Sequence, residues 1–272
     1  MPPSKEISQN ETANLISKKA MVVVAHADDA EYGCSGTIAK LCSQKWDVTY
    51  VLCTNGSKGS SDKNMTSEEI AAIRRKEQIE AGHVLGLKDV AFLDAPVSGG
   101  EPGAIAGSLA IMVGGKKEVF DAQYALLSTM GGSIVLCGDY GAGNTTKLAN
   151  QIIVAANIEA VAEALVLAKK AGLDPSVVFN AIKGGLAGST VLNAKAPMMI
   201  EGNFQPGFRI VLHQKDLHNA LLTGKDLGVP LPVTSLVQQM LGALINDGKG
   251  DADHSAIANF IEGMAGTTIS SG

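Results

Sequence analysis

The chain has 272 residues, of which 46% are hydrophobic and 18% charged, a composition typical of a protein with a buried core and a length suited to about two domains. Its net charge of −5 argues against nucleic acid as the main partner, because binding to phosphates requires clustered lysines and arginines and no basic stripe is present. The first 20 residues contain no apolar leader, and no later run reaches the roughly 18 uninterrupted apolar residues of a membrane span. We therefore expect a cytoplasmic protein that binds a small molecule and neither nucleic acid nor membrane.

The first half of the chain alternates between two kinds of segment. Residues 1–19 are polar with little apolar period, which predicts a flexible arm. Beyond them, short β-branched runs alternate with amphipathic stretches, which predicts a parallel sheet with helical crossovers. The predicted strands are 21–25, 48–53, 90–93, 109–113 and 133–137, and the predicted helices are 36–45, 67–86 and 116–129. We expect residues 95–140 to extend the sheet that begins at residue 21.

The second half of the chain is predicted to be entirely helical. Apolar residues at helical spacing run from Asn144 to Ala171, which predicts an unusually long helix between two domains. Asp174 followed by Pro175 is typical of a new helix start. Further helices are expected at 175–183, 189–199, 213–227, 232–246 and 253–264. The four cysteines, Cys34, Cys42, Cys53 and Cys137, form no Cys-x-x-Cys pair, so free thiols in a reducing compartment are expected.

The first predicted strand runs directly into a cluster of metal-binding residue types. His26, Asp28, Asp29 and Glu31 follow the run Met-Val-Val-Val-Ala, and ligands of open α/β sheets bind at the carboxyl ends of the strands. Zinc prefers histidine nitrogen and carboxylate oxygen, and hydrolysis also needs a second carboxylate as a base. The alternative interpretation is a solvated, hydrogen-bonded strand end without a metal.

Residues 20–93 resemble the PIG-L/LmbE-type N-acetylglucosaminyl deacetylases. The resemblance rests on Ala-His-Ala-Asp-Asp-Ala-Glu at 25–31, where Ala27 replaces a proline of the family pattern, and on Cys-Thr-Asn-Gly at 53–56 and Arg-Arg-Lys-Glu at 74–77. It implies His26 and Asp29 as zinc ligands and Asp28 as general base. The family's later His-x-x-His segment is absent, since His83, His213, His218 and His254 form no such pair. Two protein ligands are one short of a usual catalytic zinc site.

A second constellation begins at Asp94 and has the groups that reduction of a 3-oxo acid requires. Such a reaction needs a clamp for the substrate carboxylate and a proton donor for the forming alkoxide. Ser98, Gly99 and Gly100 can offer a hydroxyl and backbone N–H groups to the carboxylate. Lys147 can supply the proton, and Asn150 and Gln151 lie one helical turn away from it. A lysine on a solvated helix face is the alternative interpretation of Lys147.

Residues 94–266 resemble the β-hydroxyacid dehydrogenases, also called the 3-hydroxyisobutyrate dehydrogenase family. The match includes Gly-Gly-Leu-Ala-Gly-Ser-Thr-Val-Leu at 184–192, Pro-Gly-Phe-Arg-Ile at 206–210 and Ala-Asp-His-Ser at 252–255. The resemblance implies that Ser98, Gly99 and Gly100 bind substrate, that Lys147 is the catalytic acid/base, and that Asn150 and Gln151 orient substrate. It also implies that Phe208, Lys215 and Asp216 approach the nicotinamide of NAD or NADP.

The family's N-terminal Gly-x-Gly-x-x-Gly turn, which places a pyrophosphate on a helix N-terminus, is missing from this chain. Gly33 and Gly36 have the wrong spacing, and Gly141 and Gly143 lack the third glycine. Asp28, Asp29 and Glu31 after the first strand would repel a pyrophosphate. We therefore expect an NAD(P)-dependent reductase of a small 3-hydroxy or 3-oxo acid whose cofactor affinity is impaired. A zinc hydrolase without its third ligand and an inactive chimera are the alternatives.

Together these features predict the fold class and the domains. We expect an α/β three-layer Rossmann-like N-terminal domain, followed by an all-α C-terminal domain like that of 6-phosphogluconate dehydrogenase and joined to it by a long helix. The predicted domains are 20–140, deacetylase-like to residue 93 and dehydrogenase-like from 94, and 141–272 for substrate binding and dimerisation. A homodimer is expected because a long alanine-rich helix such as 148–168 exposes apolar faces.

Overall fold

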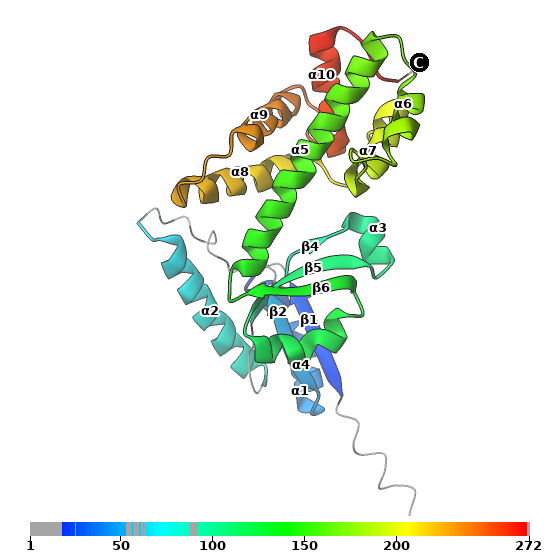
Figure 1. The fold of residues 1–272 in the computed structure, drawn as a ribbon. Coiled ribbons are helices and arrows are strands. Elements are labelled where there is room, and N and C mark those ends of the chain that lie inside the picture. Colours follow the sequence, from blue (N-terminus) through cyan, green and yellow to red (C-terminus); the bar gives the residue numbers. More distant parts are fainter. Residues whose placement is uncertain are drawn as a thin grey trace, which may run out of the picture. The chain divides into compact units, whose positions relative to one another are not determined.

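The computed structural model describes residues 18–24, 26–52, 56, 60, 62, 64–87 and 92–270, and Figure 1 shows their helices and strands in chain order. The chain divides into two compact units. The first contains Met1–Val97 and Ala110–Asn144, and the second contains Ser98–Leu109 and Thr145–Gly272. The predicted arm at 1–19 lies outside the described residues except for its last two positions. The domain boundaries drawn from the sequence stay predictions.

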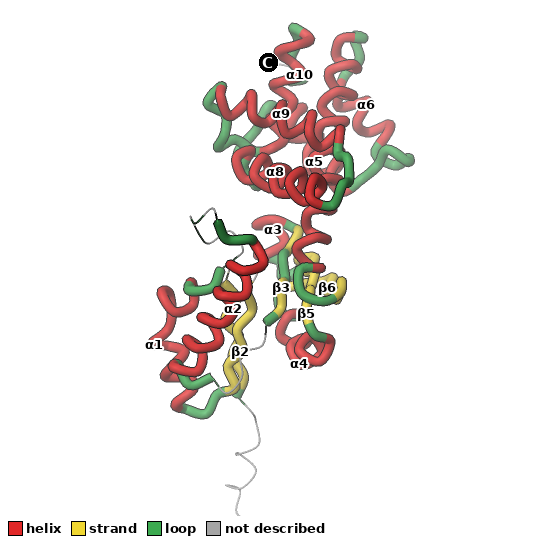
Figure 2. Tube along the Cα trace, turned by 90° about the vertical axis from the view of Figure 1, so that its left-hand side faces the viewer, coloured by secondary structure: helices red, strands yellow, loops and turns green. Residues whose placement is uncertain are grey.

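The first unit combines strands and helices, as its alternating sequence pattern predicts. Its elements are β1 (Lys19–Val24), α1 (Asp29–Ser43), β2 (Asp47–Leu52), α2 (Ser67–Val84), β3 (Leu93–Asp94), β5 (Leu109–Gly115), α4 (Lys117–Leu127) and β6 (Gly131–Gly138). The short elements β4 (Val97–Ser98) and α3 (Gly100–Ile105) lie between β3 and β5 in the chain. Helices α1 and α2 lie side by side (Figure 2), and Gln78 of α2 donates a hydrogen bond to Glu31 of α1. Tyr50 and Ile38 are fully buried in the core that β2 and α1 share.

The start of α2 confirms the capping signal in the sequence, whereas the start of α1 differs from the prediction. The Thr66 hydroxyl accepts a hydrogen bond from the Glu69 N–H, and the Glu69 carboxylate accepts one from the Thr66 N–H, which is a complete capping box. Helix α1 begins at Asp29, seven residues before the predicted start at 36. Its pattern is interrupted at Cys34, whose φ of −150° is not helical, between Gly33 and Gly36. Periodicity therefore detected only the regular second part of this helix.

The expectation of one continuous parallel sheet is corrected by the strand pairing. β1 and β2 are parallel, in the register Lys19 to Asp47, as predicted. Among the described residues these two strands form a sheet of their own, and β3, β4, β5 and β6 form a second sheet of four strands. In that second sheet β3 runs antiparallel to β5. The residue pattern of a short buried strand does not encode which neighbour it pairs with or in which direction, so this part of the topology was not accessible from the sequence.

The second unit is helical, and the predicted helices are confirmed to within a few residues. They are α5 (Ala142–Lys170), α6 (Pro175–Ile182), α7 (Thr190–Glu201), α8 (Ile210–Asp226), α9 (Pro232–Asn246), the short 3₁₀ helix η2 (His254–Ile257) and α10 (Ala258–Ala265). Asp174 caps α6 by accepting a hydrogen bond from the Ser176 N–H. The predicted helix at 253–264 is divided into η2 and α10. Ile158, Leu217 and Leu241, from three of the helices, are fully buried in one core.

Helix α5 is long and apolar. Its most apolar 18-residue window has a mean hydropathy of 1.7, so its length and composition alone would suit a membrane span. In the described part of the chain it is the one helix that meets this criterion. The central helix of a helical core has the same properties, and the α5 side chains Ile158, Ala162 and Leu165 are buried against the other helices of the second unit. Burial in a helical core therefore accounts for the apolar character of one face of α5, while Ile153 and Leu167 on another face are exposed.

Candidate functional site

The start of α5, the helix that carries Lys147, is fixed by the buried carboxylate of Asp94. One oxygen of Asp94 accepts from the Gly141 N–H and the other from the Asn144 N–H, each at 2.9 Å. These are N–H groups that a helix start leaves without intrahelical partners, and the carboxylate also lies at the positive end of the helix dipole. A Cβ at Gly143 would lie 2.4 Å from the Met112 carbonyl oxygen, so this position requires glycine. The sequence pattern did not indicate this role of Asp94, although Gly141 and Gly143 stand close together at the start of the long helix.

Lys147 lies in a mostly buried environment near the start of α5. Burial lowers the pKa of its ammonium group, the charge of Asp216 opposes that effect, and the charge of Lys215 adds to it. Asp216 itself accepts a hydrogen bond of 2.7 Å from the side-chain amide of Gln151, which is 4% exposed. The structure thus brings together the predicted acid/base and two residues, Lys215 and Asp216, that were predicted to bind the cofactor.

Asn150 and Gln151 were predicted as a pair that orients substrate, and the structure places them next to each other. The Asn150 side-chain amide donates to the Gln151 side-chain oxygen at 2.8 Å. Because the Gln151 amide donates in turn to Asp216, Gln151 connects α5 to α8. This geometry gives Gln151 a structural task, the connection of two helices, that its position in the sequence did not indicate. The substrate-orienting roles of both residues stay predictions.

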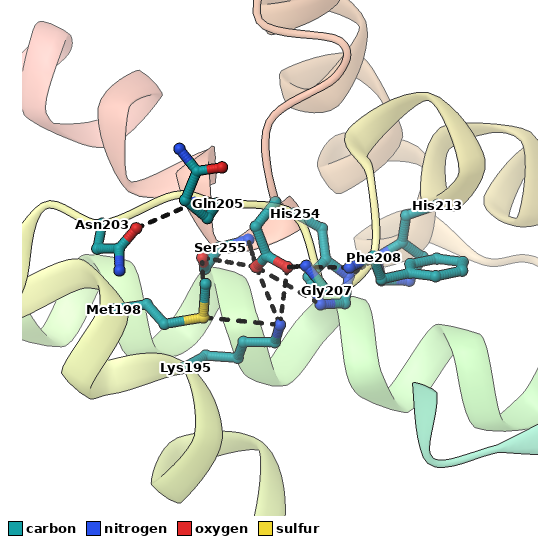
Figure 3. Close-up of polar contacts among 10 residues, drawn as sticks. Lys195, Met198, Asn203, Gln205, Gly207, Phe208, His213, His254 and Ser255 are labelled. Atoms are coloured by element: carbon teal, nitrogen blue, oxygen red, sulfur yellow. Dashed lines mark hydrogen bonds and ion pairs between the residues drawn. The ribbon is translucent and has the colours of Figure 1, made fainter. Parts of the chain in front are cut away.

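Asp253 is the centre of a buried polar network that includes Phe208, another predicted cofactor residue, and Figure 3 labels its partners Lys195, Gly207, Phe208 and Ser255. The carboxylate has no exposed surface and accepts from the Lys195 ammonium at 2.9 and 3.0 Å. It also accepts from the N–H groups of Gly207, Phe208 and Ser255. Burial alone would raise the pKa of Asp253, but these hydrogen bonds and the nearby positive charge outweigh burial and lower the pKa to about 2.

Two buried histidines join this network to α5. The Nδ1 atoms of His213 and His254 are 2.8 Å apart, and the His213 Nε2 lies 3.3 Å from the Gln151 carbonyl oxygen. The Phe208 ring packs edge-on against both imidazoles, with centroid distances of 5.7 and 5.4 Å. Burial lowers the pKa of His213, and burial together with His213 and Lys195 lowers that of His254 to about 3, so both rings are neutral near pH 7. The network holds Phe208 in place. In the sequence, only the Asp-His-Ser match at 253–255 pointed to this network.

Ser98, Gly99 and Gly100 occupy the end of β4 and the start of α3. Gly99 and Gly100 have φ values of 139° and 60°, which side-chain-bearing residues rarely adopt. A Cβ at Gly99 would also lie 3.0 Å from a methyl group of Leu109. The segment Ser98–Leu109 belongs to the same compact unit as Lys147. Its role as a clamp for the substrate carboxylate stays a prediction.

The turn after β1 brings the two predicted zinc ligands, His26 and Asp29, close together, but the predicted general base, Asp28, is paired with an arginine. The Asp29 carboxylate accepts from the His26 N–H at 2.9 Å and lies 3.4 Å from the His26 Nδ1. Asp28 instead forms an ion pair of 2.7 Å with Arg74, which also donates to the Ala27 carbonyl oxygen. No group of three or more metal-ligating side chains occurs among the described residues. The predicted general base is therefore engaged by arginine, and within the described part of the chain no third metal-ligating side chain joins the two predicted ligands.

A pyrophosphate would meet carboxylates at this turn instead of a glycine cradle. Asp28 adopts φ 86°, a conformation that glycine adopts easily, but it carries a charged side chain there. Asp29 and Glu31 stand in the first turn of α1, the position where the helix dipole would otherwise attract an anion. The residues present therefore do not fit a nicotinamide dinucleotide in the manner of a glycine-rich turn.

Comparison with known proteins identifies two families that match this chain. The 2-hydroxy-3-oxopropionate reductase of Escherichia coli is 46% identical over 214 residues, which are 78% of this chain and 72% of that enzyme. A sequence family described as GlcNAc-PI de-N-acetylase matches residues 21–172. The chain belongs to both the β-hydroxyacid dehydrogenase and the GlcNAc-PI de-N-acetylase families.

Further matches bear on the dehydrogenase family. The 2-(hydroxymethyl)glutarate dehydrogenase of Eubacterium barkeri is 37% identical over 205 residues, 75% of this chain and 68% of that enzyme. Residues 141–261 match the family described as NAD-binding of NADP-dependent 3-hydroxyisobutyrate dehydrogenase, so a nicotinamide dinucleotide is the supported class of cofactor. The de-N-acetylase match extends past the predicted limit at residue 93 and overlaps this region at 141–172.

Solved structures of β-hydroxyacid dehydrogenases confirm the fold class. The 3-hydroxyisobutyrate dehydrogenase of Salmonella typhimurium has a TM-score of 0.62 and 23% identity, covering 89% of this chain and 78% of that one. The Mycobacterium tuberculosis 3-hydroxyisobutyrate dehydrogenase has a TM-score of 0.61 and 25% identity, with the same coverage. The protein thus has a Rossmann-like N-terminal domain and a helical C-terminal domain, joined by α5.

Proposed function

We propose that the protein reduces a small 3-oxo acid with NADH or NADPH. The proposed substrate is tartronate semialdehyde, which is 2-hydroxy-3-oxopropionate. The name of the 46% identical E. coli relative supports the substrate, and the NAD-binding match supports the cofactor. The observation that carries the proposal is the mostly buried Lys147, which has a lowered pKa and lies near Asp216. Such a lysine is a stronger acid than a solvated one and is suited to protonate an alkoxide.

In this proposal the predicted site residues of the second unit have defined tasks. Ser98, Gly99 and Gly100 hold the substrate carboxylate, and Asn150 orients the substrate beside Lys147. The Lys147 ammonium donates its proton to the carbonyl oxygen as that oxygen gains charge. Phe208, Lys215 and Asp216 face the side on which a nicotinamide would supply hydride. The buried Asp253 network supports this arrangement by holding the Phe208 backbone.

Turnover is expected to be far below that of a dehydrogenase with a glycine-rich turn. Holding two reactants in the reactive geometry can lower the activation free energy by roughly 7 to 11 kcal/mol. The carboxylates of the β1–α1 turn remove the usual anchor for the pyrophosphate, so most of that contribution is lost. The test is the loss of reduced nicotinamide absorbance with tartronate semialdehyde and either NADH or NADPH. A rate equal to that of the E. coli enzyme would contradict the impairment, and a rate equal to the background without protein would contradict the proposed function.

A zinc-dependent de-N-acetylase is the second candidate, favoured by the match at residues 21–172 and by the proximity of His26 and Asp29. We expect zinc to bind weakly there, because two ligands leave the other positions to water and Asp28 is paired with Arg74. Dialysis against a chelator followed by metal analysis should leave less than stoichiometric zinc. Retention of one zinc per chain would contradict this expectation and favour the hydrolase.

We also propose that the protein is a cytoplasmic homodimer formed through the helical unit, with no nucleic acid or membrane partner. Ile153 and Leu167 of α5 are 61% and 71% exposed, and Ala160 and Ala164 between them are also exposed. This apolar stripe is suited to packing against the same stripe of a second copy. Light scattering in dilute solution should give about twice the chain mass of 28.0 kDa. A concentration-independent mass of one chain would contradict the dimer.

A further inference from the structure

A cavity of about 300 Å³ lies within the first unit, and none of the residues that line it is assigned above to substrate. Ala27, three residues after the end of β1, and Leu52, the last residue of β2, contribute to its wall, so it opens at the carboxyl ends of these strands. Ala71 and Ala72 of α2 add further apolar surface. The carboxyl ends of parallel strands are where open α/β sheets bind ligands, and the volume is at the lower end of small-molecule sites.

Two adjacent arginines of α2 line this cavity, and only one of them is engaged by carboxylates. Arg74 forms ion pairs with Asp28 and Glu77. The Arg75 guanidinium lies 5.0 Å from the centre of the Phe92 ring and 4.5 Å from that of Tyr140. Within the described residues, no hydrogen bond or ion pair engages its five donors. The two rings hold a cationic fork at the cavity wall, and its N–H groups are available to an anion.

Among the described residues, the other charged groups around the cavity form their hydrogen bonds and ion pairs with groups other than Arg75. The Asp94 carboxylate is occupied by the N–H groups of Gly141 and Asn144. Asp139, which lies near Arg75, forms an ion pair of 2.8 Å with Lys116. The cavity therefore combines an apolar wall with one available guanidinium, and a ligand that matches it has a flat ring, whose faces pack on the apolar wall, and an anionic group.

We propose that this cavity binds a nucleoside monophosphate unit, with its phosphate on Arg75 and its base against the wall of Ala71, Ala72 and Leu52. An inorganic phosphate alone would leave the apolar wall uncovered, and a free nucleoside would leave the guanidinium without an anion. The same chemistry is found in a free nucleotide and in the adenylate part of a nicotinamide dinucleotide. In the second case the proposal deepens the proposed function and rests on it, because Arg75 then holds the phosphate of the adenylate part of the cofactor.

Isothermal titration of the full chain with AMP tests this assignment. Wild-type protein should bind AMP more tightly than it binds adenosine or inorganic phosphate. Arg75→Gln should weaken AMP binding by at least about tenfold, the usual effect of losing charge-assisted hydrogen bonds. Lys76→Gln is the matched control: Lys76 is the next residue of α2 and has only a weak ion pair of 3.9 Å with Glu80, so AMP affinity should not change. Thermal unfolding confirms that both variants fold.

Competition between NADPH and AMP shows whether the cavity takes a free nucleotide or the adenylate part of the cofactor. If NADPH displaces AMP, the cavity takes the adenylate part of the cofactor, and if both bind together, it takes a free nucleotide; either result supports the site. Absence of AMP binding to folded wild-type protein, or equal affinity in Arg75→Gln, overturns it. AMP binding without reductase activity contradicts only the proposed function, and reductase activity without AMP binding contradicts only the cavity site.

Discussion

Replacement of Asp253 by asparagine is expected to lower the free energy of unfolding by about 3–5 kcal/mol. The Asp253 side chain has no exposed surface, and its ion pair with Lys195 is shielded from water. An asparagine keeps one acceptor oxygen but leaves the Lys195 ammonium mostly buried without an opposite charge. Its amide group would also face N–H donors of Gly207 and Phe208 that now donate to a carboxylate oxygen. Such a loss is a large fraction of the stability of an ordinary domain.

Denaturant unfolding of the wild type and of Asp253→Asn measures this difference in the free energy of unfolding. Asp251→Asn is the matched control, since Asp251 is 85% exposed in an ion pair with Arg209 and should change stability by no more than about 0.5 kcal/mol. A loss in Asp253→Asn as small as that of the control would show that the network does not stabilise the unit.

The pH dependence gives an independent check on Asp253. Because the folded-state pKa, about 2, is below the ordinary value of 3.8, the ionised carboxylate stabilises the fold above about pH 4. This contribution should be lost as the pH falls from about 4 to about 2. The stability difference between the wild type and Asp253→Asn should therefore shrink over that range. A difference that is constant down to pH 2 would contradict the lowered pKa.

The local signals in the sequence predicted the helices well because each signal lies within a few residues of its effect. The capping box of Thr66 and Glu69 and the cap of Asp174 are examples. The pairing of β3 with β5 was not predictable in the same way, because it depends on a close approach between distant segments. A Cβ at Gly114 would lie 2.3 Å from Asp94 Oδ1, so the absence of a side chain there permits the contact. Only the folded geometry reveals that requirement.

The candidate site shows the same division between local and distant contacts. Lys147, Asn150 and Gln151 could be proposed because they share one helix face. The contact of Lys195 with Asp253 joins residues 58 positions apart, and that of His213 with His254 joins residues 41 apart. Neither pair has a spacing that periodicity can detect, and each residue alone is compatible with an ordinary surface position. The Asp28 ion pair with Arg74 similarly joins positions 46 apart, and it changes the interpretation of the first turn.

Replacement of Lys147 by alanine is expected to reduce the residual reductase rate by roughly a hundredfold or more, the usual cost of removing a donor to developing negative charge. Burial lowers the pKa of Lys147, which makes its ammonium a better acid in the step where the carbonyl oxygen becomes an alkoxide. Alanine offers no proton, and water at this site would be less well oriented. Steady-state oxidation of NADPH or NADH with tartronate semialdehyde measures the loss, which should appear mainly in kcat.

Lys170→Ala is the control for this variant, because Lys170 is an exposed lysine at the other end of α5 and its loss should leave the rate unchanged. The pH profile separates a proton donor from a residue that only shapes the helix. In the wild type, the rate of reduction should fall as the pH rises through the lowered Lys147 pKa, since the donor is then deprotonated. That fall should be absent in Lys147→Ala. A residual rate that is the same in wild type and Lys147→Ala, or a pH profile that the substitution leaves unchanged, would assign the proton transfer to another group and would leave Lys147 as a structural residue of α5.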